Sequence, residues 1–232
     1  MDFTHRCNRL ARKLFEIGAF LDKSRSPEGK GFKLKLHEKN SDAPLSPYYL
    51  NFRTPDHPTK SGPLTPEVIK EIGAVLYHRS LGLAYNQVAG IPRAGDPLAE
   101  AFFDIWRSNS KRLSFGCGII KLDKEESLEK RQVTKIKEGH WDPGERVLLI
   151  DDLVTKADSK LEAIEALEKN QLRVRDILVL VDREEGGVDV LNAKGYNVHW
   201  IFKFTDLLWL YRNEGLITQE AYKEIEDYLG GN

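Results

Sequence analysis

The feature that most constrains the fold is a pair of short, wholly apolar runs in the second half of the chain. The runs are VLLI at residues 147–150 and ILVLV at residues 177–181. A strand that is apolar on both faces is typical of a parallel sheet covered by helices. Between the runs, Leu161, Ile164 and Leu167 follow helical spacing. The sequence therefore predicts an α/β fold with a central, mostly parallel sheet flanked by helices.

Residues 65–204 are expected to form this core. Thr65 and Pro66 have the pattern of an N-cap followed by proline at the first helical position. The predicted strands cover residues 88–91, 113–120, 147–150, 177–181 and 198–202. The stretch at 121–140 is highly charged, contains no buried run and is expected to be a loop. Residues 205–232 are expected to form a helical C-terminal extension.

Residues 1–64 predict a smaller N-terminal part, a helix followed by a hood of loops and short strands. Residues 5–21 have the spacing of an amphipathic helix. The segments FKLKL at 32–36 and YYLNFR at 48–53 read as short strands that pair with each other. Prolines and polar residues between them favour loops.

Composition excludes several classes of protein. The 232 residues include 35 Lys+Arg against 36 Asp+Glu, which does not fit a general nucleic-acid binder. No apolar run approaches the roughly 18 residues of a membrane helix. The two cysteines, Cys7 and Cys117, make neither a disulfide framework nor a zinc motif. A cytoplasmic protein is the expectation.

Polar residues of an unusual kind follow the strand at 147–150. Asp151 and Asp152 are adjacent, and hydroxyls follow at Thr155 and Ser159, where a helix is expected to begin. Free N–H groups at a helix start suit a phosphate, and carboxylates beside them suit sugar hydroxyls. The same residues also fit a helix cap and two solvated acids, so the pattern alone leaves both interpretations open.

Four segments resemble one family in the expected order. VLLIDDLVT at 147–155 is similar to the phosphoribosyl-diphosphate (PRPP) motif of type I phosphoribosyltransferases. The other segments are similar to orotate phosphoribosyltransferases in particular: FKLK with SPYYLNFR at 32–35 and 46–53, AGIPRAGDPLA at 89–99 and VLVDREEGG at 179–187. The resemblance implies a magnesium-dependent homodimer that makes orotidine monophosphate and pyrophosphate from orotate and PRPP in pyrimidine biosynthesis.

The resemblance also implies roles for single residues. Asp151 and Asp152 would hold the ribose hydroxyls and stabilise the cationic sugar, with Lys124 as a further catalytic group. The 5′-phosphate would bind at Thr155, Lys156, Ala157, Asp158 and Ser159. Pyrophosphate would bind at Arg93, Ala94, Gly95, Lys121 and Lys124. Orotate would bind at Lys35, Tyr48, Tyr49, Thr155 and Arg183. Magnesium would be held mainly by PRPP, with no direct protein ligand.

Ordinary structural roles compete with some of these assignments. Arg183 could form an ion pair with Glu184 or Glu185 at an exposed strand end. Lys35 could protect an edge strand from pairing. One of Tyr48 and Tyr49 is expected in the core, because their faces alternate.

The chain departs from the family pattern in its phosphate loop and its charged loop. Ala157 stands where the family has glycine, and it fits only with a negative φ; Asp158 beside it repels phosphate. Residues 121–137 carry only part of the mobile catalytic loop that, in the family, reaches the neighbouring subunit. Two alternatives stay open: a non-catalytic PRPP- or nucleotide-binding regulator, and a phosphoribosyltransferase for another base.

Overall fold

The computed structural model describes residues 2–34, 40, 42–109, 117–126 and 131–230. The chain divides into two compact units. The first, called the core unit below, comprises residues 1–7 and 65–204. The second, called the hood unit, comprises residues 8–64 and 205–232, so it combines two segments that are far apart in the sequence.

A six-stranded sheet forms the middle of the core unit, in the order β5-β4-β3-β6-β7-β8. Its strands are β3 (Gln87–Gly90), β4 (Gly118–Glu126), β5 (Arg131–Glu138), β6 (Arg146–Val154), β7 (Arg173–Asp182) and β8 (Asn197–Lys203). Every neighbouring pair is parallel except β4 with β5. The predicted α/β fold with a mostly parallel sheet is confirmed.

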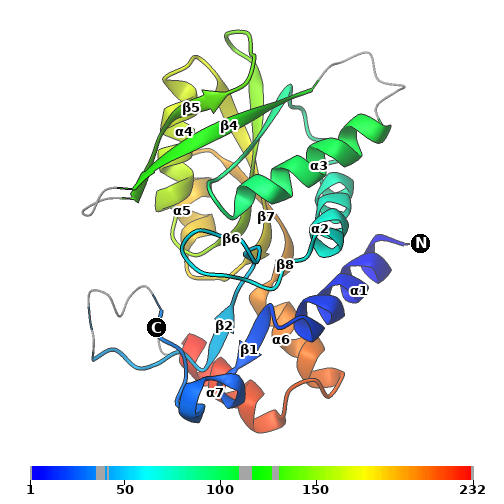
Figure 1. The fold of residues 1–232 in the computed structure, drawn as a ribbon, viewed down its shortest axis with the longest axis vertical. Helices are drawn as coiled ribbons and strands as arrows, with labels where there is room; N and C mark the ends of the chain where they lie inside the picture. The colour runs from blue at the N-terminus through cyan, green and yellow to red at the C-terminus, as the bar shows by residue number, and fades with distance from the viewer. Residues whose placement is uncertain (1, 35–39, 41, 110–116, 127–130, 231–232) are drawn as a thin grey trace. The chain divides into compact units, whose positions relative to one another are not determined.

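Helices cover both faces of this sheet: α2 (Pro66–Arg79) and α3 (Gly95–Asn109) lie on one side, α4 (Asp158–Glu168) and α5 (Gly187–Ala193) on the other (Figure 1). Burial explains why the apolar runs were so clear a signal. Leu148, Leu149 and Ile150 of β6 are fully buried, because each face of the strand meets a helix layer. Ile164 and Leu167 of α4 are buried against the sheet, as their spacing predicted.

The strand order reverses between β3 and β6, which are neighbours in the centre of the sheet. From β3 the chain continues to β4 on one side, and from β6 it continues to β7 on the other. Because the two strands are parallel, with Gly90 opposite Ile150, the loop after β3 starts beside the last residues of β6. Ligands of open α/β sheets bind at such a reversal, beyond the carboxyl ends of the strands.

The prediction of a loop over residues 121–140 is wrong for the residues that the structure describes. β4 and β5 pair as an antiparallel hairpin, from Lys121 opposite Glu138 to Glu126 opposite Arg131. The hairpin needs little apolar surface, because Leu122 is buried and Ile136 packs on the same core cluster. The strand predicted at 113–120 begins at Gly118, and its first residues lie outside the described part.

The hood unit contains a two-stranded antiparallel sheet of β1 (Phe20–Asp22) and β2 (Tyr48–Leu50). The predicted pairing of residues 32–36 with 48–53 is wrong for residues 32–34, of which Phe32 makes an isolated bridge with Ser46, while residues 35 and 36 lie outside the described part. The reason is a chain reversal at Gly18, whose φ of +78° suits glycine. This turn lets the segment after the first helix become the partner of β2.

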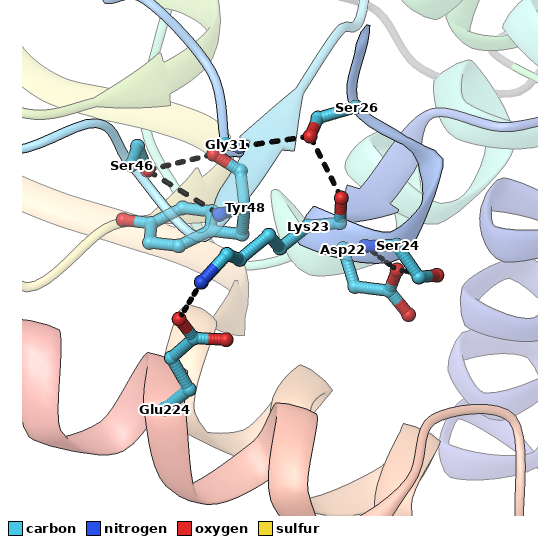
Figure 2. Close-up of polar contacts among 8 residues, drawn as sticks. All are labelled: Asp22, Lys23, Ser24, Ser26, Gly31, Ser46, Tyr48 and Glu224. Atoms are coloured by element: carbon cyan, nitrogen blue, oxygen red, sulfur yellow. Dashed lines mark hydrogen bonds and ion pairs between the residues drawn. The ribbon is translucent and has the colours of Figure 1, made fainter. Parts of the chain in front are cut away.

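The remaining helices are α1 (Phe3–Glu16), α6 (Phe204–Asn213) and α7 (Gln219–Gly230), with short 3₁₀ turns η1 (Lys23–Arg25) and η2 (Pro27–Gly29) after β1. Figure 2 shows how side chains hold this turn segment. The Ser26 hydroxyl donates to the Lys23 carbonyl over 2.7 Å and accepts the Gly31 N–H over 2.8 Å. Lys23 pairs with Glu224 of α7 over 2.5 Å, which ties the N-terminal part of this unit to its C-terminal helix.

Candidate active site

Two adjacent carboxyl groups lie at the carboxyl end of β6, on the core unit's central strand. Asp151 is 5% exposed and Asp152 is half-buried. β6 does not end at Ile150, as the apolar run suggested, but continues to Val154, because β7 keeps pairing with it as far as Asp182. The acid pair is therefore held by sheet backbone rather than by a loop.

The sequence analysis missed the cation that accompanies these acids. Lys160, in the first turn of α4, is 3% exposed, and its Nζ lies 2.5 Å from Asp151 Oδ2 and 2.5 Å from the Leu153 carbonyl oxygen. Removing an ammonium group from water costs several kcal/mol unless it is paired. One signal was available: Lys160 lies four residues before Ile164 and seven before Leu167, on the inward stripe of the helix.

Burial gives two acids of the site unusual protonation behaviour. Burial, together with the adjacent Asp151, raises the pKa of Asp152 to about 8, although Lys160 acts in the opposite direction. Burial likewise raises the pKa of Asp96, in the first turn of α3, to about 7, with added repulsion from Glu100 and Asp151. Both shifts favour the protonated acids near neutral pH, because burial and neighbouring negative charges each disfavour the carboxylate form.

The predicted phosphate loop joins β6 to the start of α4. Ala157 has a φ of −77°, so an L-residue fits where the family has glycine, and that conditional prediction is confirmed. Thr155 and Ser159 are half-buried, whereas Lys156 and Asp158 are exposed. The N–H groups of the first turn and its dipole favour an anion, but the carboxylate of Asp158 at the same turn opposes one.

The end of β7 is bonded to the phosphate loop. The Arg183 N–H donates to the Val154 carbonyl over 3.0 Å, and the Gly187 N–H donates to the Thr155 carbonyl over 3.0 Å. A Cβ on Gly187 would lie 2.4 Å from the Thr155 oxygen, so this approach requires glycine. The structure thereby brings Thr155 and Arg183 together. The Arg183 guanidinium forms a 2.7 Å ion pair with Glu185, the structural role that competes with orotate binding.

The loop after β3, predicted to bind pyrophosphate, packs directly on the acid pair. A Cβ on Gly95 would lie 2.6 Å from the Ile150 carbonyl oxygen and 3.1 Å from Asp151 Oδ1. Gly95 is therefore needed for close packing, in addition to any contact with a phosphate. The Pro92–Arg93 peptide bond of this loop is cis. Arg93 is exposed and Ala94 is half-buried.

Two lysines reach this loop region from β4. Lys124 Nζ lies 3.5 Å from the Pro92 carbonyl oxygen, and Lys121 forms a 2.8 Å ion pair with Glu100 of α3. The structure therefore brings Lys124 to the loop of its own chain, whereas Lys121 pairs with the helix that follows this loop. The expectation that Lys124 belongs to a structureless loop is wrong, because it lies within a strand.

The predicted orotate-binding residues of the hood unit behave differently from one another. Tyr48 is 1% exposed and belongs to the core of its unit, whereas Tyr49 is half-buried, as the alternation predicted. The Tyr49 ring stacks on Phe32 at 5.6 Å between ring centroids and carries the Lys60 ammonium at 4.0 Å. Lys35 lies outside the described residues. A role in binding orotate stays a prediction for all three.

Among the described residues, no group of three or more His, Cys, Asp or Glu side chains could hold a metal ion. In the same part of the chain, no helix has the length and apolar character needed to cross a bilayer.

The order reversal between β3 and β6, the acid pair at that point, the helix-start loop after it and the glycine-bearing loop beside it define a type I phosphoribosyltransferase fold.

Comparisons with known proteins identify the family within this class, although no family model matches the chain. The orotate phosphoribosyltransferase of Aquifex aeolicus is 30% identical over 172 residues, covering 73% of this chain and 86% of the relative. Uridine 5′-monophosphate synthase of Bos taurus is 25% identical over 169 residues, covering 72% and 33%. The solved structure of Leishmania donovani UMP synthase matches with a TM-score of 0.71 at 26% identity, covering 97% of this chain and 42% of that one.

The chain belongs to the orotate phosphoribosyltransferase family. It spans a third of the bovine relative and 42% of the Leishmania chain, so it corresponds to one part of those longer proteins.

Proposed function

We propose that the protein transfers the 5-phosphoribosyl group from PRPP to orotate, giving orotidine 5′-monophosphate and pyrophosphate for pyrimidine nucleotide biosynthesis. The observation that carries the proposal is the acid pair at the strand reversal, with the phosphate loop bonded to the strand end that bears Arg183. Sugar, phosphate and base ligands would then share one edge of the sheet. The relatives named orotate phosphoribosyltransferase support the same reaction.

In this reaction the bond between ribose C1 and a pyrophosphate oxygen breaks, and its electron pair leaves with pyrophosphate. The lone pair of deprotonated orotate N1 forms the new bond to C1. Positive charge grows on the sugar meanwhile, and carboxylates beneath it stabilise that charge. Negative charge grows on the departing diphosphate, and Arg93, Lys121 and Lys124 are proposed to stabilise it. Positioning and charge stabilisation supply the rate, without a covalent enzyme intermediate.

Arg183 is proposed to select the base, because its planar guanidinium suits the carboxylate of orotate. The phosphate loop is proposed to hold the 5′-phosphate with backbone N–H groups, helped by the hydroxyls of Thr155 and Ser159. Tyr49 and Lys35 of the hood unit are proposed to contact the base; Tyr48, being buried, is the weaker candidate.

Mg²⁺ is the proposed cofactor. The oxygen-rich acid pair suits a hard cation, but the Asp151 carboxylate is already occupied by Lys160, which favours a magnesium ion bound mainly by PRPP. That ion would neutralise charge on the diphosphate. A homodimer is proposed from the family resemblance. Cytoplasmic residence is proposed because both cysteines are free thiols, which suits a reducing compartment.

The test is a product assay with PRPP, Mg²⁺ and either orotate or uracil, in which orotidine monophosphate and pyrophosphate are measured together. We expect turnover with orotate and little with uracil. Arg183→Ala should lose about 1.5–3 kcal/mol of orotate recognition, a charged hydrogen-bonded contact. Arg175→Ala, at an exposed position of the same strand, is the matched control and should match the wild type.

Equal use of orotate and uracil, unaffected by Arg183→Ala, would overturn the choice of base. A second candidate, a non-catalytic PRPP-binding regulator, is favoured by the ion pair that already engages Arg183 with Glu185. Calorimetric binding of Mg²⁺·PRPP without any product would support that regulator and overturn the enzymatic proposal.

A further inference from the structure

We propose that Lys160 is the positioning residue of the acid pair: it retains the Asp151 carboxylate within the protein, so that Asp152 alone presents carboxyl oxygens to the ribose hydroxyls. The inference rests on the proposed function and deepens it. It gives the two acids different roles, a structural one for Asp151 and ribose binding for Asp152, where the same role was expected for both.

Both oxygens of Asp151 already accept hydrogen bonds from the protein. Oδ1 accepts the Asp152 N–H over 2.9 Å, and Oδ2 accepts the Lys160 ammonium over 2.5 Å. The side chains of this ion pair are only 3% and 7% exposed, so neither group has bulk water as an alternative partner. A carboxylate bonded in this way organises its neighbours and has little surface to offer a ligand.

Asp152 differs in degree: its carboxyl group also interacts with Asp151, but it has no contact with the Lys160 ammonium as short as that of Asp151. It is half-buried rather than buried, and its Oδ1 accepts the N–H of Leu153, the next residue, over 2.8 Å. The Leu153 carbonyl in turn accepts the second hydrogen bond of Lys160. One ammonium group therefore fixes the residues on both sides of Asp152. Its side chain is left as the carboxyl group of the pair that a sugar can reach.

The positive charge of Lys160 also offsets the repulsion among the neighbouring acids. Asp151 is close enough to affect both Asp152 and Asp96, so three acids share this edge of the sheet. The groups that act on Asp152 are Asp151 from its own strand and Lys160 from α4. Among the described lysines and arginines, Lys160 is the one buried cation, and a neutral residue there would leave the acids to share further protons.

Helix α4 offers a matched control. Lys169, at the other end of the helix, pairs with Glu165 over 2.7 Å, but these side chains are 68% and 61% exposed. Lys160→Met and Lys169→Met are the same chemical change, and each removes a lysine from an ion pair. Only the first removes a buried charge beside the proposed ribose site.

The experiment uses the full chain as wild type, Lys160→Met, Lys160→Arg and Lys169→Met. Turnover and KM for Mg²⁺·PRPP are measured from about pH 6 to 9, and ¹³C carboxyl shifts follow the acid pair in the ligand-free protein. For Lys160→Met we expect kcat to fall at least tenfold, KM to change less than threefold, and the acidic limb of the profile to move to higher pH. The Asp152 carboxyl signal should titrate at higher pH as well.

Lys160→Arg should recover part of the turnover, and Lys169→Met should stay within twofold of the wild type. If Lys160→Met does not fold, the double variant Lys160→Met/Asp151→Asn keeps the test open, because it removes both buried charges together. We expect the double variant to fold and to retain at least tenfold more activity than Asp152→Asn.

A Lys160→Met protein with wild-type kcat, pH profile and carboxyl titration would show that the lysine only stabilises the fold. A double variant as inactive as Asp152→Asn would show that Asp151 binds the sugar directly. Either result overturns the inference. A wild type that forms no orotidine monophosphate would instead contradict the proposed function, and the ligand-free titration would still decide whether Lys160 controls the acid pair.

Discussion

Charged side chains are buried on one side of the sheet's carboxyl edge and exposed on the other. On the β6–β7 side, acids lie on buried parallel strands, and Asp151 is 5% exposed. On the β4–β5 side, lysines lie on an antiparallel hairpin, and the Lys121 side chain is 45% exposed. Burial fixes the direction of a side chain and shifts its protonation, whereas exposure keeps it charged and adaptable. The acids therefore suit a sugar of defined geometry, and the lysines suit a mobile polyanion.

Helix α4 repeats this contrast over three turns. Breaking an exposed pair such as Lys169–Glu165 is worth about 0.3–0.5 kcal/mol of stability. Breaking a buried pair such as Lys160–Asp151 costs about 3–5 kcal/mol, because it leaves a buried charge without its partner. The burial of an ion pair therefore decides its contribution to the stability of this protein more than the number of ion pairs does.

The largest expected effect tests the acid side. Asp152→Asn replaces the carboxyl group beneath the sugar, which can ionise as the sugar becomes cationic, with an amide that cannot, and should lower activity at least tenfold, about 1.4 kcal/mol or more. Steady-state assays with PRPP and orotate measure the loss. Asp176→Asn is the control. Asp176 is an acid on the neighbouring strand β7, but it lies near the start of that strand, where it is hydrogen-bonded to His199. Comparable losses of kcat in both variants would contradict a special role for the carboxyl edge.

The next prediction concerns stability and pH. Burial raises the pKa of Asp96 to about 7, above its unfolded value near 3.9, so the stability that its neutral form provides is lost as pH rises through 7. Asp96→Asn stays neutral and should be more stable than the wild type at pH 8 by up to about 4 kcal/mol, roughly three pKa units at about 1.4 kcal/mol each, with no difference below about pH 4. Urea unfolding at both pH values measures this. Asp104→Asn, at an exposed site of α3, should show no such dependence.

A smaller effect tests the hairpin side. Lys124→Ala should lower activity about three- to fivefold, because other cations near the diphosphate remain. Lys135→Ala on β5, whose side chain is 60% exposed, is the control.

Mixed dimers of Lys124→Ala and Asp152→Asn subunits refine that comparison. Because Lys124 contacts the Pro92 carbonyl of its own chain, the mixed dimers should show no more than the mean activity of the two variant homodimers. Recovery would instead assign Lys124 to the neighbouring subunit's site, as the family resemblance implies.

The smallest expected effect concerns the phosphate loop. Asp158 is exposed in the first turn of α4, so Asp158→Asn should tighten Mg²⁺·PRPP binding about twofold at low salt, and less at high salt, by removing a screened repulsion. Calorimetry at two salt concentrations measures the change, with Glu165→Gln further along the helix as the control. Weaker binding by Asp158→Asn would mean that Asp158 stabilises the N-terminus of α4, and that this effect outweighs its repulsion of the phosphate.

The sequence alone was sufficient for the centre of the core unit. The runs at 147–150 and 177–181 predicted β6 and β7, and the spacing of Ile164 and Leu167 predicted the buried face of α4. Asp151 and Asp152 could be placed at a strand end for the same reason. These elements can be predicted from their own apolar residues. A strand that is buried on both faces is apolar along its whole length, whichever strands it pairs with.

The tertiary structure decided which segments pair and which charges are buried. Residues 121–138 carry too few apolar residues to signal a strand, yet β4 and β5 pair with each other while Leu122 anchors them on the core. β2 pairs with β1 because of the turn at Gly18. Lys160 lies on the inward stripe of α4, but a lysine is rarely buried without a partner, and its partner Asp151 comes from another element. Backbone pairing and ion-pair partners depend on residues distant in sequence, so local pattern could not predict them.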